Sequence, residues 1–222
     1  AMVAAHALLL ETCGPVHAQV RQALGWEGKV AFVLYVGVGC GAGWATTYGG
    51  LPAVLFGLEN VAECGWTEPA PLSGLIAHEL GHLAHQGWRA QAGLEPGSGP
   101  WWDLYEEGFA QRCEHVALGG ESWHMACGYQ GPGWLSWCRE HSGWLAGEYL
   151  RRADAAEDTR PFFGSWFEVR GHSQTGYFLG HEVVAALQRE LWLQEIALLG
   201  REEIESRCRA VLAALSRHSR WN

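Results

Sequence analysis

The sequence predicts an α+β fold in which a small N-terminal mixed sheet packs on helices. β-branched and aromatic runs typical of strands lie before about residue 61, and helical hydrophobic periodicity dominates from about residue 74. Strands followed by helices are typical of α+β layouts. With 222 residues, of which 48% are hydrophobic and 18% charged, the chain can bury a sizeable core. We expect one domain over 1–222, with a helix plus strands in about 1–73 and mainly helices in about 74–222.

The N-terminal elements follow from the local patterns, taken in order. Residues 5–25 are predicted to form an amphipathic helix. The run KVAFVLYVGV (29–38) is typical of a buried strand, and the glycines that follow it predict a flexible loop. A short strand is expected at 44–48 and a further one at Pro52–Val61. After a proline-containing loop, a helix is expected from about Gly74 to Trp88.

The second part of the chain is read as helical. Residues 93–100, GLEPGSGP, indicate a loop, and a helix is expected over about Trp102–Leu118. The segment 119–143 is rich in Gly, Trp and Cys without clean periodicity, so we expect a loop or short helices. Three more helices are expected, at about 144–156, 175–192 and 201–217.

Composition excludes several classes of function. The formal net charge of −9 argues against nucleic acid or an anionic membrane as the main partner. No stretch approaches the roughly 18 apolar residues of a membrane span. The seven cysteines are scattered without a CxxC pair, so we expect mostly buried, reduced thiols and a cytoplasmic protein. A Cys127–Cys138 disulfide is the alternative.

Residues 75–86, LIAHELGHLAHQ, contain the HExxH pattern from His78 to His82. Because helix residues four apart lie on one face, one turn apart, these two histidines can bind a single ion. Zinc takes neutral imidazole nitrogens, and catalytic zinc sites use three protein ligands plus a water. Glu79 stands beside the pair, where a general base would take a proton from that water. We therefore expect a Zn²⁺ cofactor; a buried helix with hydrogen-bonded histidines is the alternative.

A third ligand is expected in the segment WWDLYEEGFAQRCEHVAL (101–118). Here the chain resembles the gluzincin metallopeptidases, in particular the membrane alanyl aminopeptidase and leukotriene A4 hydrolase group. Those enzymes carry an E-G-[FH] signature whose Glu binds zinc, so the resemblance implies that Glu107 is the third ligand. The resemblance covers roughly 30–185 and implies a zincin-like fold. The interval from His82 to Glu107 is several residues longer than in that group.

The same helix offers other acidic and imidazole groups. The resemblance places a second Glu seven residues after the ligand, which is Glu114, on the helix face that would let it hydrogen-bond a zinc histidine. Glu106 and His115 compete with Glu107 as third ligand. Glu106 lies about 100° around the helix from Glu107, so only one of these two carboxylates can face the metal.

Two further site residues are implied by the resemblance. Gly57-Leu58-Glu59-Asn60 is similar to the G-x-M-E-N signature of these aminopeptidases, in which the Glu holds the substrate amino terminus beside an edge strand. Pro52–Val61 would be that edge strand, and a surface Glu at a strand end is the alternative for Glu59. Tyr177 resembles the Tyr that stabilises the oxyanion in gluzincins, with His172 and His181 as competing donors.

The leading hypothesis is a zinc metallopeptidase that cleaves a peptide or protein substrate, with the endopeptidase or aminopeptidase choice open. A metzincin is disfavoured because Trp88 stands where its third His would be, and His85 is expected to be structural. One alternative is a catalytically silent protein that keeps the zincin fold for binding or regulation. Another is structural zinc closed by a fourth ligand, His115 or His181. The sequence does not set the oligomeric state.

Overall fold

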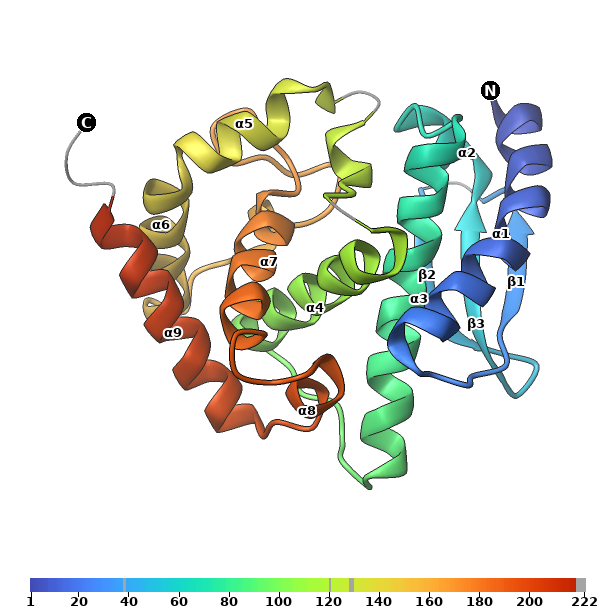
Figure 1. Ribbon diagram of the computed structural model, residues 1–222. Helices are drawn as coiled ribbons and strands as arrows, with labels where there is room; N and C mark the ends of the chain where they lie inside the picture. Colours follow the sequence, from blue (N-terminus) through green and yellow to red (C-terminus); the bar gives the residue numbers. More distant parts are fainter. Residues whose placement is uncertain (38, 120, 128–129, 219–222) are drawn as a thin grey trace. The chain divides into compact units, whose positions relative to one another are not determined.

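The structure is a computed structural model that describes residues 1–37, 39–119, 121–127 and 130–218 (Figure 1). The chain divides into two compact units, and each is described by itself. The first comprises Ala1–Gly87 with Ala110–Gly131, and the second comprises Trp88–Phe109 with Pro132–Asn222. The prediction of a single domain over 1–222 stays a prediction.

The first unit holds the sheet and the helices that pack with it. Its elements are α1 (Met2–Leu24), β1 (Ala31–Tyr35), β2 (Gly43–Tyr48), β3 (Leu51–Gly57), α2 (Leu58–Glu63), most of α3 (Pro69–Gln91), the second half of α4 (Pro100–Leu118) and the 3-10 turn η1 (His124–Ala126). Among the described residues, the three strands form one mixed sheet in the order β1-β3-β2. β3 pairs in parallel with β1 and antiparallel with β2. The predicted N-terminal mixed sheet and the α+β class are confirmed.

Helix α1 covers the face of the sheet that carries Phe32 (Figure 1). The His17 ring of α1 meets the Phe32 ring at 5.9 Å, and Phe32 stacks with Phe56 on the neighbouring strand at 6.4 Å. Phe56 is fully buried, as are Ala53 and Val54 on the same strand. These contacts place part of the core of this unit between α1 and the central strand.

Two predicted strands are shorter in the structure than in the prediction. β1 ends at Tyr35, and Val38 lies outside the described residues. The predicted strand Pro52–Val61 ends at Gly57, and the chain turns into α2. Leu58 and Val61 are both buried. Residues three apart share a face of a helix but point to opposite faces of a strand, so burying both favours the helix.

The second unit is helical. Its elements are the first half of α4, α5 (Gly133–Glu140), α6 (Ser142–Asp154), the 3-10 turn η3 (Arg160–Phe162), α7 (Thr175–Leu187), α8 (Leu193–Ala197) and α9 (Arg201–His218). The helix predicted over 175–192 ends at Leu187. Trp192 instead caps α8, and its backbone N–H donates to Glu195 Oε2 at 2.7 Å. α6 packs along α9 (Figure 1). An added Cβ at Gly180 of α7 would lie 2.9 Å from Gly108 Cα of α4, so these two helices meet backbone to backbone.

Arg89 connects the loop after α3 with the end of α8 through hydrogen bonds. Its side chain is 7% exposed and lies over the Trp102 ring at 4.7 Å. The guanidinium donates hydrogen bonds to the carbonyls of Ala197, Leu199 and Glu95 at 2.8–3.0 Å. A buried cation is stable here because three carbonyl oxygens and an indole face replace its water.

All seven cysteines are free, and five of them are buried. Reduced, mostly buried thiols were the expectation, and it is confirmed. The alternative Cys127–Cys138 disulfide is wrong, since both of these thiols are free.

No helix in the described part of the chain is long and apolar enough to cross a membrane.

Candidate metal centre

Helix α3 carries the two histidines of the HExxH pattern one turn apart. The rings of His78 and His82 lie 4.9 Å apart between centroids, with their planes at 79°. His78 is 2% exposed, whereas His82 is only half-buried. A pair of imidazoles on one face of a buried helix suits zinc, and the more open side lies at His82.

Glu79 follows His78 on α3 and lies against the first residue of β2. Its side chain is 6% exposed. A Cβ added at Gly43 would lie 3.1 Å from Glu79 Cγ and 3.2 Å from Glu79 Oε1. The missing side chain at Gly43 therefore lets the β2 backbone approach the carboxylate closely.

Helices α3 and α4 meet at a second close approach. A Cβ added at Gly81 would lie 2.7 Å from Cys113 Cβ and 3.1 Å from Ala110 Cα. The glycine lies inside the HExxH pattern, beside His82. Its lack of a side chain thus sets the distance between the histidine-bearing helix and α4.

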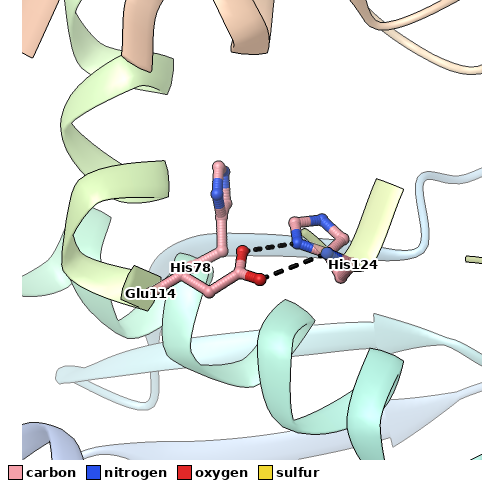
Figure 2. A group of neighbouring side chains, drawn as sticks. All are labelled: His78, Glu114 and His124. Atoms are coloured by element: carbon pink, nitrogen blue, oxygen red, sulfur yellow. Dashed lines mark hydrogen bonds and ion pairs between the residues drawn. The ribbon is translucent and has the colours of Figure 1, made fainter. Parts of the chain in front are cut away.

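Glu114, on α4, is the most buried acidic group near these histidines. Its side chain is 0% exposed. Oε1 accepts hydrogen bonds from Ser122 Oγ at 2.7 Å and from the His124 backbone N–H at 3.1 Å. Oε2 pairs with His124 Nδ1 at 2.7 Å (Figure 2). Both oxygens of this carboxylate are therefore bonded within the protein.

The charges around Glu114 favour its ionised form. Burial by itself raises the pKa of Glu114. The nearby charge of His124 and its hydrogen bond, the charge of His78 and the Ser122 hydrogen bond act in the opposite sense and outweigh it. The pKa of Glu114 consequently lies below its usual value, and the group is a carboxylate at neutral pH.

His78, Glu114 and His124 together can hold a metal ion. One donor atom from each lies within 4.8 Å of the others, and all three side chains are buried. The distance between Glu114 Oε2 and His124 Nδ1, 2.7 Å, is that of a hydrogen bond. Two ligands of one zinc, each at about 2.0–2.1 Å, stand roughly 3.3 Å apart in a tetrahedral arrangement. An ion held by both of these atoms would have to replace that hydrogen bond.

Glu114 was predicted to hydrogen-bond a zinc histidine. In the structure, the histidine that it hydrogen-bonds is His124. Sequence reasoning assigned no role to His124 and so missed it. Only the fold brings it to Glu114, ten residues earlier in the chain. No motif links the two positions, because the turn η1 that carries His124 follows an aperiodic segment.

The other predicted residues lie in both units. Glu107 is half-buried on α4 in the second unit, where its negative charge adds to burial in raising the pKa of Asp103 one turn earlier. Tyr177 is half-buried in the first turn of α7, and its ring meets Phe163 at 6.0 Å. The roles of Glu107 as ligand and of Tyr177 as oxyanion donor stay predictions. Glu106 is half-buried beside Glu107.

The edge-strand prediction is wrong for Pro52–Val61. That segment forms β3, which is paired on both sides and is therefore the centre of the sheet. β2 is the edge strand that lies at Glu79. Glu59 is the second residue of α2, and its Oε1 accepts the backbone N–H of Gly37 at 2.7 Å.

The remaining histidines have varied surroundings. His85 is 1% exposed on α3. His115 packs edge-on against Trp123 at 4.9 Å, and His172 stacks on Trp137 at 3.8 Å. His181 Nδ1 bonds the neighbouring Glu182 carboxylate at 3.0 Å. Burial lowers the pKa of His172, and the charge of a nearby histidine, His141, lowers it further.

No known protein family model matches this sequence, and comparisons with curated proteins and with solved structures found no match.

Proposed function

We propose that this chain is a zinc-dependent hydrolase that cleaves peptide bonds, with His78, His82 and Glu107 as zinc ligands and Glu79 as general base. The observation that carries the proposal is the position of the Glu79 carboxylate. It lies one residue from a paired-histidine turn and against the backbone of an edge strand at Gly43. The base of a metal-dependent peptide hydrolase has to stand next to both the metal-bound water and the substrate backbone.

The donor set fits zinc. His78 and His82 offer nitrogen atoms on one helix face, and a carboxylate would complete a His₂Glu set with a position left for water. Glu107 is chosen because it matches the zinc-binding Glu of the E-G-[FH] signature in the gluzincins that the chain resembles. When bound, zinc lowers the pKa of water and polarises a carbonyl oxygen.

The protein's own groups would move the proton. Glu79 Oε accepts the proton that the nucleophilic water loses as its oxygen bonds to the peptide carbonyl carbon. The same carboxyl returns that proton to the amide nitrogen as the C–N bond breaks, so the leaving amine departs neutral. Tyr177 is proposed to donate its phenol O–H to the oxyanion that forms on the carbonyl oxygen.

The edge strand supports a peptide as substrate. β2 pairs on one side with β3, and its other side has no strand among the described residues. An extended peptide can add to such an edge through main-chain hydrogen bonds, which recognise any sequence. Because β2 begins at Gly43, a peptide paired with it would bring a backbone carbonyl toward Glu79.

Glu59 bears on the choice between an aminopeptidase and an endopeptidase. One of its oxygens already serves the Gly37 backbone N–H. The other, Oε2, is buried and has no hydrogen-bond partner among the described residues. In an aminopeptidase, Oε2 would be the oxygen that takes the substrate ammonium group. Cleavage of peptides with free and with acetylated amino termini separates the two activities.

The test compares wild type with Glu79→Gln, using Glu68→Gln, an exposed Glu just before α3, as the matched control. Zinc content is measured by elemental analysis, and hydrolysis is measured on a mixture of fluorogenic peptides. We expect all three proteins to hold zinc. The E79Q variant should lose roughly 10²–10⁴-fold in rate, the usual worth of a general base, while the E68Q variant stays unchanged. Equal hydrolysis by E79Q and wild type would refute Glu79 as the base.

A closed, structural metal site is the second candidate function. It is favoured by one observation, the complete burial of the group formed by His78, Glu114 and His124. A closed site would hold zinc without peptide hydrolysis, and removing zinc would lower stability without a change in any activity. The same experiment separates the two functions, because only the hydrolase makes E79Q differ from E68Q.

A further inference from the structure

The pair formed by Glu114 and His124 has no part in the proton transfers proposed above, yet both of its side chains are buried. The two side chains are 0% and 3% exposed. Burying a carboxylate without compensation is strongly unfavourable. Three protein hydrogen bonds to its two oxygens provide that compensation here.

The hydrogen bond fixes the tautomer of His124. An ionised carboxylate can only accept, so the proton of the bond at Nδ1 belongs to His124. The ring itself is held edge-on between Trp66, at 5.0 Å and 76°, and His78, at 5.2 Å and 68°. The orientation of His124 is thus set from three sides.

Helix α3 fits closely onto this pair. A Cβ added at Gly74 would lie 2.7 Å from Glu114 Oε1 and 2.8 Å from His124 Cβ. Gly74 precedes His78 by one helical turn. The pair therefore touches α3 at two successive turns, at the Gly74 backbone and at the His78 ring.

We propose that His124 is a positioning residue for the metal centre. Held by Glu114, it fixes the orientation of the His78 ring, and the carboxylate behind it favours a divalent cation on that ring. The inference rests on the proposed zinc site, and it adds a residue that no motif marks. A histidine ligand commonly depends on such outer partners, whose removal costs about 10–100-fold in metal affinity.

The experiment measures zinc affinity by competition with a chromophoric chelator for wild type, His124→Ala and His124→Asn. His17→Ala is the matched control, since His17 is a first-unit histidine packed edge-on against Trp26 and Phe32. We expect H124A to bind zinc about 10–100-fold more weakly. The H124N variant should regain part of the affinity, because an Asn amide nitrogen can donate to Glu114 from nearly the position of Nδ1 but lacks the ring that contacts His78. The H17A variant should match wild type.

Circular dichroism and the visible spectrum of the Co²⁺-loaded proteins complete the design. An H124A variant that is folded and has wild-type affinity would overturn the proposal. So would a loss far beyond a hundredfold together with a changed Co²⁺ spectrum, since His124 would then be a ligand itself. If wild type binds zinc tightly but cleaves no peptide, the proposed hydrolysis fails while the affinity series still tests His124. If wild type binds no zinc, both proposals are refuted.

Discussion

Replacing Gly81 by Ala tests whether the HExxH helix really needs its close approach to α4. The added methyl would stand 2.7 Å from Cys113 Cβ, 3.1 Å from Ala110 Cα and 3.2 Å from the Ala110 carbonyl oxygen. Favourable contacts between carbon atoms lie at about 3.5–4.0 Å. None of these three atoms can rotate away, because two belong to the backbone and the third is a Cβ. The helices would have to separate by somewhat less than 1 Å at this crossing.

Two opposing terms give the size of the effect. Forcing a methyl into a packed core costs about 1–3 kcal/mol. Exchanging Gly for Ala inside a helix stabilises it by about 1 kcal/mol. Since rigid atoms surround the new methyl, we expect the upper part of the first range. The variant should therefore lose about 1–2 kcal/mol of unfolding free energy. It should also bind zinc more weakly, because His82 adjoins the crossing.

Urea unfolding followed by tryptophan fluorescence measures this difference. Gly147→Ala is the matched control. Gly147 lies inside helix α6, and an added Cβ there meets only Ser216 Cβ, at an ordinary 3.8 Å. The G147A variant should gain up to about 1 kcal/mol from helix propensity. If G81A proves as stable as G147A, the two helices do not meet as closely as described, and the reasoning fails.

Three further predictions concern other parts of the chain. Arg89→Ala should cost about 2–4 kcal/mol in urea unfolding, since three carbonyl oxygens, one buried and two partly buried, lose a charged donor; an unchanged midpoint would contradict this. Free zinc at a hundred times its Kd should stabilise wild type by about 2.7 kcal/mol and raise its Tm by about 5–10 °C. Chelator should abolish the shift and His82→Ala should not show it, whereas a persistent shift in H82A would exclude His82 as a ligand. Hydrogen bonds from Arg151 and then Arg152 lower the pKa of Glu148 to about 2, so its contribution is present above about pH 4.5 and is lost as the pH falls toward 2. The stability difference between wild type and Glu148→Gln should be roughly 0.5–1 kcal/mol at pH 7 and vanish over that range; a constant difference would mean that the pKa is not lowered.

The sequence by itself determined the elements whose signal is local. The HExxH helix needs only a 3.6-residue period, and the pairing of His78 with His82 follows from four-residue spacing on one helix. The order of strands and helices was likewise readable from short-range periodicity. Boundaries were less accurate, and the run after Gly57 is helical although it was predicted as strand.

Only the tertiary structure decided which distant residues meet. His124 hydrogen-bonds Glu114, and Gly43 lies against Glu79. The missing side chain at Gly74 leaves room for the pair formed by Glu114 and His124. The edge of the sheet at Glu79 is β2 rather than the segment that was predicted for it. A periodicity records the face on which a residue lies, and it carries no information about the partner that covers that face. Burial of a carboxylate and the close approach of two backbones are properties of the packed pair, so neither residue alone predicts them.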